Sequence, residues 1–269
     1  MRNHSNPTIA ISNRIFSSTQ DLIDYAFENN LWAIDYSFPF DTQNFLDLRK
    51  EVVFIEKIAE MGFEIRFHCP FKSIEIAHTD KDFANYSLQI LNACVDIAVE
   101  FGVRFLTTHI GLGFKSANEL DYETSLKNLS SLVNYGERGE ITVCLENLTS
   151  GWTNNPHSFL ELIEKTGASV TFDLGHSNSS PWFIENEGGS VEFLRSIASY
   201  IVNAHIYEKE EIDELTGQPY HVPPHDLDSI RPLLLALIDT KCDWWLIELK
   251  IQDQVDHTLS LLRSFLDEK

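Results

Sequence analysis

The chain has 269 residues, 43% of them hydrophobic, which is enough to bury a substantial core in one large domain or two small ones. Its 41 acidic and 20 basic residues give a formal net charge of −21. This charge disfavours nucleic acid and anionic membranes as partners, because phosphate binding depends on Lys and Arg. No stretch is long and apolar enough to span a membrane, and residues 1–12 lack the apolar core of an export signal.

The four cysteines are scattered along the chain with no C-x-x-C pair. This pattern favours free thiols over disulfides or a structural zinc site, and we therefore expect a cytoplasmic protein. Cys69 and Cys144 adjoin the polar residues discussed below. The alternation of side chains along a strand is expected to turn both thiols away from those residues.

In chain order, short apolar runs typical of strands alternate with longer amphipathic runs typical of helices. The strand-like runs cover residues 8–12, 32–38, 64–70, 103–111, 141–147, 169–176, 201–208 and 244–250. The helix-like runs cover residues 19–30, 45–62, 81–102, 121–138, 155–167, 190–200, 227–241 and 253–269. This alternation predicts a parallel sheet, and eight such units in roughly 250 residues match a (β/α)8 barrel. We therefore expect an α/β fold, a single-domain TIM barrel over residues 1–269, with a doubly wound open sheet as the alternative.

Acidic residues and histidines fall at the ends of six of the predicted strands. In chain order they are His68, His109, Glu146, Asp173, His205 and Glu248. His176 follows Asp173 closely. The long segment after the seventh strand adds His221, with His225 and Asp226 as further candidates. Because the carboxyl ends of barrel strands open on one rim, these side chains are expected to share one polar site.

A site with this many carboxylates and imidazoles is typical of a divalent cation. Burying unpaired charges costs several kcal/mol each, and a bound cation would offset that cost. Imidazole and carboxylate ligands without a thiolate suit Zn²⁺, Mn²⁺, Co²⁺ or Fe²⁺ better than a soft metal or Ca²⁺. Gly175, just before His176, is expected to let the chain turn sharply, so that His176 points back toward the same site.

A family resemblance covers nearly the whole chain, and it is carried by the ordered strings "FHCPF", "TTHIG", "CLEN", "FDLGH", "NAHIYE" and "LIELK". The chain resembles the xylose-isomerase-like TIM-barrel superfamily. This superfamily includes sugar isomerases and epimerases and the endonuclease IV type of abasic-site nuclease (AP endonuclease family 2). As in the ketose epimerases, the resemblance implies one metal, held by Glu146, Asp173, His205 and Glu248. For the nuclease branch it implies two further metals, one on His68 and His109 with Glu146 bridging, and one on His176 and His221.

Two departures from the nuclease pattern make the nuclease the alternative rather than the first expectation. That branch has an aspartate two residues before the histidine that matches His221, and here the position is Pro219, whose side chain cannot act as a ligand. The residue before His176, a cysteine in the nuclease motif, is Gly175. The third metal site is therefore expected to be incomplete.

The resemblance implies a divalent-metal-dependent sugar or sugar-phosphate isomerase or epimerase, with Mn²⁺, Co²⁺ or Zn²⁺ as its cofactor. Glu146 and Glu248 would face each other across the substrate and transfer a proton on the carbon next to a carbonyl. The metal would stabilise the resulting enediolate. His176 would hold a substrate hydroxyl, unless it holds the third metal together with His221.

Further candidates for the substrate pocket are Trp152 and Trp182, which lie near the predicted rim, and Lys209, for a phosphate or carboxylate. The expected partner is a small carbohydrate, and a homo-oligomer is compatible with the sequence, which carries no specific interface signal. Two alternatives to the isomerase stay open. One is an endonuclease IV-like multi-zinc phosphodiesterase, and the other is a non-catalytic barrel that binds a metal or ligand.

Overall fold

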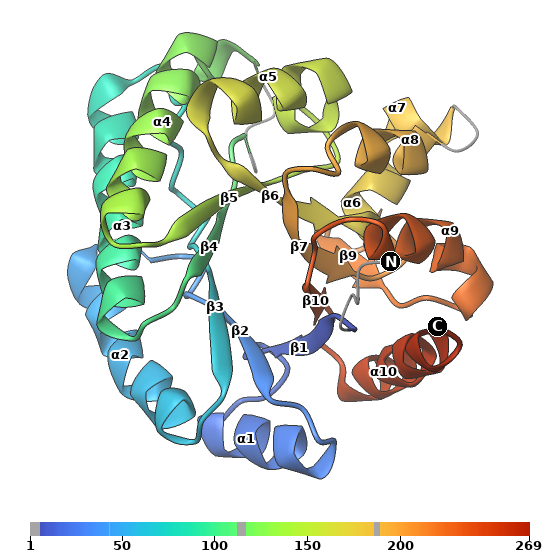
Figure 1. The fold of residues 1–269 in the computed structure, drawn as a ribbon. Coiled ribbons are helices and arrows are strands. Elements are labelled where there is room, and N and C mark those ends of the chain that lie inside the picture. Colours follow the sequence, from blue (N-terminus) through green and yellow to red (C-terminus); the bar gives the residue numbers. More distant parts are fainter. Residues whose placement is uncertain (1–5, 43, 112–116, 186–188) are drawn as a thin grey trace.

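Eight parallel strands close into a barrel, and helices surround it (Figure 1). The barrel strands are β1 Thr8–Ser12, β2 Ala33–Ser37, β3 Glu64–His68, β4 Phe105–Thr108, β5 Thr142–Glu146, β6 Ser169–Asp173, β7 Ile201–Ile206 and β10 Trp244–Ile247. Their order is β1-β10-β7-β6-β5-β4-β3-β2, and β1 pairs with both β2 and β10 to close the barrel. This confirms the α/β fold class and the (β/α)8 TIM barrel predicted from the sequence.

The computed structural model describes residues 6–42, 44–111, 117–185 and 189–269. Residues 1–5, part of the stretch in which we expect no export signal, lie outside the described residues. Across the described ranges, no helix is long and apolar enough to cross a membrane.

The helices follow the strands in sequence. They are α1 Thr19–Glu28, α2 Phe45–Glu60, α3 Lys81–Glu100, α4 Tyr122–Arg138, α5 Pro156–Thr166, α6 Leu174–Ser179, α7 Pro181–Ile184, α8 Gly189–Ser196, α9 Leu227–Ile238 and α10 Gln252–Asp267, with short 3-10 turns η1 Ala117–Glu119 and η2 Trp152–Asn154. The segment after β6 differs most from the prediction of one helix over residues 190–200, because it divides into α6, α7 and α8. As a result, His176 lies on a helix and not on a strand.

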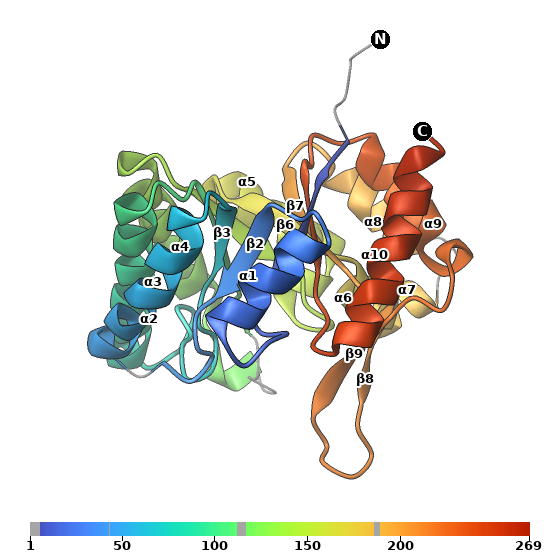
Figure 2. The ribbon, with the colours of Figure 1, turned by 90° about the horizontal axis from the view of Figure 1, so that it is seen from below.

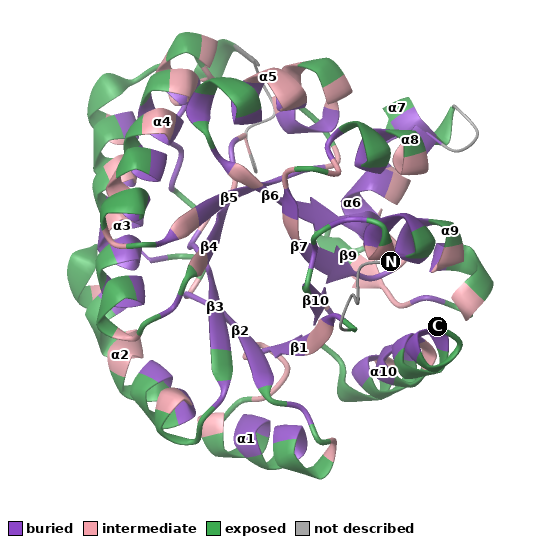
Figure 3. Ribbon diagram, viewed as in Figure 1, coloured by how far each residue is buried: buried purple, intermediate pink, exposed green. Residues whose placement is uncertain are grey.

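Side chains fill the interior of the barrel below the rim that the carboxyl ends of its strands form. Figure 3 shows that the barrel strands and the inward faces of the helices are mostly buried, as expected for a parallel sheet covered on both sides. Inside the barrel, Ala10, Ala33, Trp244 and Leu246 form an apolar cluster separate from the core between strands and helices. Toward the amino ends of the strands, the guanidinium carbon of Arg66 lies 3.9 Å from the centroid of the Phe105 ring. Polar side chains at the carboxyl ends therefore line the open end of the barrel.

A β-hairpin interrupts the long segment after β7. It consists of β8 Lys209–Ile212 and β9 Pro219–Val222, which pair in antiparallel register with Glu210 opposite His221. The hairpin leaves the barrel at the carboxyl end of β7 and projects away from it (Figure 2). The hairpin thus brings the side chains of Glu210 and His221 to the rim.

Candidate metal centre

Four residues from four neighbouring strand ends converge at the rim. They are Glu146 at the end of β5, Asp173 at the end of β6, His205 in β7 and Glu248 just after β10. One ligand atom from each lies within 4.8 Å of the others. The Nδ1 atom of His205 is central, at 3.1 Å from Glu248 Oε2, 3.5 Å from Glu146 Oε1 and 3.6 Å from Asp173 Oδ2. The structure therefore brings together the four residues that the resemblance assigns to one metal.

Several atoms of this group have no hydrogen-bond partner in the described part of the chain. They are Asp173 Oδ2, both ring nitrogens of His205 and Glu248 Oε2, all of them buried. Buried polar atoms in proteins are nearly always paired, because an unpaired one costs the free energy of its lost hydration. A divalent cation would accept lone pairs from the two carboxylate oxygens and from one nitrogen of the neutral His205 imidazole, so the residues present fit a metal ion.

The charges of the group also favour a cation. Burial by itself raises the pKa of a carboxyl, yet the imidazoles of His205 and His109 hold the pKa of Glu146 well below its ordinary value. Burial opposes a charged imidazole, but Glu146 and Glu248 raise the pKa of His205 well above its ordinary value. The carboxylates thus require a positive charge at this point, which the His205 imidazolium or a divalent cation can supply.

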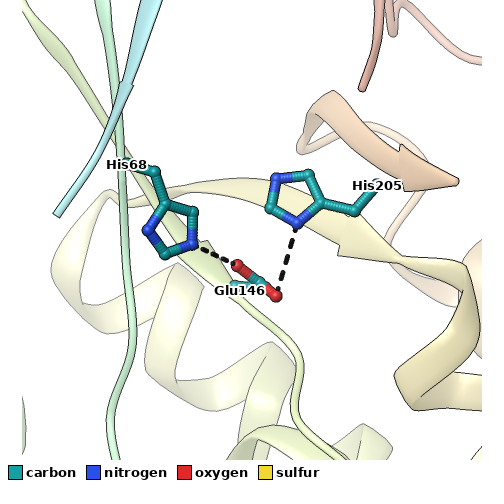
Figure 4. Close-up of side chains that lie close together, drawn as sticks. All are labelled: His68, Glu146 and His205. Atoms are coloured by element: carbon teal, nitrogen blue, oxygen red, sulfur yellow. Dashed lines mark hydrogen bonds and ion pairs between the residues drawn. The ribbon is translucent and has the colours of Figure 1, made fainter. Parts of the chain in front are cut away.

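Glu146 presents its two oxygens to different imidazoles. Oε1 faces His205, while Oε2 lies 3.3 Å from Nε2 of His68 and 3.0 Å from Nε2 of His109 (Figure 4 shows His68, Glu146 and His205). His68, Glu146 and His205 form a second group whose ligand atoms lie within 4.8 Å of one another. The two candidate ligands of a second metal, His68 and His109, therefore lie beside Glu146, the carboxylate that the resemblance implies would bridge two metals.

A third group contains His176 on α6 together with Glu210 and His221 on the hairpin. The Nε2 atom of His176 lies 3.5 Å from Glu210 Oε2. Sequence reasoning missed Glu210 and expected an incomplete site, because Pro219 replaces an aspartate. The structure places a carboxylate there from β8, since Glu210 lies directly across the hairpin from His221.

Three of the histidines are oriented in the same way by main-chain carbonyls. Nδ1 of His68 lies 3.0 Å from the carbonyl of Cys69, Nδ1 of His176 2.9 Å from that of Asn147, and Nδ1 of His221 2.7 Å from that of Glu248. A carbonyl only accepts, so each Nδ1 carries a proton, and Nε2 is the nitrogen that the neutral imidazole can offer to a cation. Metal-binding histidines are typically fixed in this way, which supports the cation interpretation of the second and third groups.

A model of the xylose isomerase-like TIM barrel family matches residues 25–264. The chain belongs to this family. An uncharacterized protein of Methanocaldococcus jannaschii is 32% identical over 166 residues, which are 62% of this chain and 68% of that protein. A D-tagatose 3-epimerase-like protein of solved structure has a TM-score of 0.70 at 19% identity, with 97% of each chain covered. Endonuclease IV from Thermus thermophilus has a TM-score of 0.71 at 14% identity, with 98% of this chain and 100% of that chain covered. At these identities the two solved structures show the shared fold.

Other residues of this xylose isomerase-like barrel lie apart from the three groups. The half-buried ring of Trp152 packs edge-on against Tyr122 with centroids 5.0 Å apart, and Trp182 on α7 is 56% exposed. Lys209 Nζ lies 2.5 Å from Glu211 Oε1 on the same hairpin strand. The substrate-pocket roles of Trp152, Trp182 and Lys209 stay predictions.

The further candidates His225 and Asp226 make contacts within the protein, through the backbone of His225 and the side chain of Asp226. The backbone N–H of His225 donates to Glu208 Oε2 at 2.8 Å, and the carboxylate of Asp226 caps the amino end of α9. The expectation that Cys144 turns away from the barrel interior is wrong. Asn203 donates to its Sγ at 3.5 Å inside the barrel, because residues two apart on a strand share a face and Cys144 lies two before Glu146. Within the described residues, all four cysteines are free and buried.

Glycine occupies position 175 for a different reason from the sharp turn that we expect from the sequence. It lies in α6 without a positive φ, so no sharp turn requires it. A Cβ at this position would overlap the ring of Tyr207, which stacks on His221 with centroids 3.8 Å apart. Glycine is therefore required because the Tyr207 ring packs directly on the helix backbone.

Gly175→Ala is expected to lower the free energy of unfolding by about 1–3 kcal/mol, the usual cost of overpacking, as measured by urea denaturation. The added methyl group displaces Tyr207 and with it the stacked His221. In a Tyr207→Leu background, where the smaller side chain can yield, the same substitution should cost less. An equal cost in both backgrounds would show that the Tyr207 contact is not the reason for the glycine.

Proposed function

We propose that this xylose isomerase-like barrel is a divalent-cation-dependent isomerase or epimerase of a sugar or sugar phosphate. The observation that carries the proposal is the group Glu146, Asp173, His205 and Glu248, with ligand atoms within 4.8 Å of one another. Three carboxylates and one imidazole suit Mn²⁺, Co²⁺ or Zn²⁺. The likeness to a D-tagatose 3-epimerase-like protein over 97% of the chain supports a carbohydrate substrate.

The two glutamates are the proposed proton-transfer groups. Bound beside them, a divalent cation would polarise a substrate carbonyl and stabilise the negative charge that develops on its oxygen. The lowered pKa of Glu146, set by its histidine neighbours against the effect of burial, keeps that carboxylate ionised and able to accept a proton. The Glu248 side chain is 23% exposed and that of Glu146 1% exposed, so Glu248 reaches toward the open mouth of the barrel. One glutamate removes the proton from the carbon next to the carbonyl, and the other returns it.

A second candidate function is a multi-cation phosphodiesterase. The observation that favours it is the third group, in which Glu210 supplies the carboxylate that the sequence alone does not place there. Together with His68 and His109 on Glu146 Oε2, this arrangement offers ligands for more than one cation. Clusters of two or three cations activate water and stabilise a phosphodiester under attack. The net charge of −21 weighs against DNA as the substrate.

Metal analysis combined with a substrate panel separates these candidates. The purified protein is loaded with Mn²⁺, Co²⁺ or Zn²⁺ and incubated with ketoses, ketose phosphates and abasic-site DNA, and the products are identified by NMR and gel electrophoresis. The proposal expects one tightly bound cation per chain and an isomerised or epimerised sugar. Two or three Zn²⁺ ions with DNA cleavage would favour the second candidate. No turnover of any substrate would favour a non-catalytic barrel that binds a metal or ligand.

A further inference from the structure

Arg14 lies at the rim just after β1, beside the rings of Phe40 and Phe71, which stack on each other with centroids 6.1 Å apart. Its guanidinium carbon is 5.8 Å from the centroid of Phe40 and 5.5 Å from the centroid of Phe71, and one amino group donates to the carbonyl of Phe38 at 3.0 Å. The side chain is half-buried. Within the described residues, no carboxylate lies within ion-pair distance of it, and most of its five N–H donors are left for a ligand.

Lys72 brings a second cation to the same place. Its Nζ lies 5.4 Å from the centroid of Phe40, and its backbone N–H donates to the carbonyl of Phe40 at 2.8 Å. The described residues give its exposed ammonium no carboxylate partner either. Arg14 and Lys72 thus place two positive charges, neither with a carboxylate ion pair among the described residues, around the same Phe40 ring.

The Phe71 ring connects this cation pair to the candidate metal centre. It packs edge-on against His109 and His68, with centroids 5.6 and 6.3 Å apart. Glu248 also acts electrostatically on Arg14: burial lowers the pKa of the guanidinium, and the charges of Glu248 and Asp35 oppose that shift. Arg14 thus lies beside the site, one aromatic ring away from the imidazoles on Glu146.

We propose that Arg14, assisted by Lys72, binds an oxyanion carried by the substrate, so that the substrate is a sugar phosphate or sugar acid rather than a neutral sugar. That the anionic substrate is a sugar rests on the proposed function. A planar guanidinium fixed by two rings presents paired donors to phosphate or carboxylate oxygens. Two local cations also offset the repulsion that a chain of net charge −21 exerts on an anionic substrate. Lys209, the residue that the sequence suggests for this role, has its charge neutralised by Glu211.

Calorimetric binding tests the inference without requiring turnover. The probes are inorganic phosphate, D-ribulose, D-ribulose 5-phosphate and a pentonic acid, each with Mn²⁺-loaded and with chelator-treated protein. We expect Arg14→Met to weaken binding of the 5-phosphate about 10- to 100-fold, the effect of losing a charge-assisted hydrogen-bond pair, and to leave D-ribulose binding within twofold. Arg14→Lys should recover part of the loss, and Lys72→Met should cost less than Arg14→Met. Lys127→Met, on the outer helix α4, is the control for a general change of charge.

The outcomes are distinct. Preference for the 5-phosphate or for the acid identifies which oxyanion is bound. An equal loss for D-ribulose and its phosphate in Arg14→Met would overturn the inference, as would a loss that follows Lys209→Met instead. Phosphate binding that disappears on chelation and is indifferent to Arg14 would assign the anion to the metal alone. Arg14-dependent binding without any isomerisation would count against the proposed function and leave this inference standing.

Discussion

Glu248→Gln is expected to abolish isomerisation, lowering kcat by about 10²- to 10⁴-fold in a kinetic assay with the metal-loaded protein. Oε2 of Glu248 lies 3.1 Å from His205 Nδ1 and has no hydrogen-bond partner in the described chain, so it is available to a cation and to substrate. Glutamine keeps the volume of the side chain but cannot accept the proton. The circular dichroism spectrum should be unchanged, because the main-chain carbonyl of Glu248 still accepts from His221.

Glu208→Gln is the matched control for this experiment. Glu208 is also an acidic residue near the rim, and its Oε2 accepts the backbone N–H of His225, a bond that a glutamine oxygen can keep. Its activity should stay within a few fold of the unsubstituted protein. Full activity in Glu248→Gln would remove Glu248 from proton transfer and would leave Glu146 without its proposed counterpart.

Saturation with a divalent cation is expected to stabilise the protein, and Asp173→Asn is expected to remove that effect. At a cation concentration of 100 times Kd, binding to the folded state alone adds about 2.7 kcal/mol, which raises Tm by about 5–10 °C for a chain of this size. Oδ1 of Asp173 accepts the backbone N–H of His176 at 2.6 Å, and an asparagine oxygen can still do so. Oδ2 is the unpartnered atom, and asparagine replaces it with a donor that cannot bind a cation.

Differential scanning fluorimetry with and without Mn²⁺, Co²⁺ and Zn²⁺ measures this difference. Asp121→Asn is the control, since Asp121 caps α4 in the same way on the outside of the barrel. That variant should keep the full shift in Tm. An equal shift in Asp173→Asn and the unsubstituted protein would place the cation elsewhere.

The four residues of the candidate metal centre could be predicted because barrel topology converts chain order into proximity. A strand that ends in Asp173 and another that ends in Glu146 must meet at one rim once the sheet is parallel and closed. The family resemblance then supplies roles for those residues. Periodicity is sufficient for the barrel because its strands are buried on both faces and its helices alternate with them.

The parts that could not be predicted depend on local three-dimensional contacts. Glu210 reaches the site only because β8 folds back on β9, and its pairing with His221 depends on a hairpin register that strand periodicity does not fix. The sequence suggests backbone freedom as the reason for Gly175, whereas the actual reason is the Tyr207 ring, contributed by a different element. Arg14 carries no motif, and its significance follows from the stacked aromatic rings beside it.

The exchange of a carbon-bound substrate hydrogen for deuterium tests most directly whether the protein transfers a proton next to a carbonyl. The metal-loaded protein is incubated in D₂O with ketoses and ketose phosphates, and deuterium on the carbon next to the carbonyl is measured by NMR and mass spectrometry. Proton transfer through Glu146 and Glu248 predicts deuterium at that carbon in product, and its loss in Glu248→Gln. Cleavage of abasic-site DNA by the same preparation, with no deuterium in any sugar, would contradict the account.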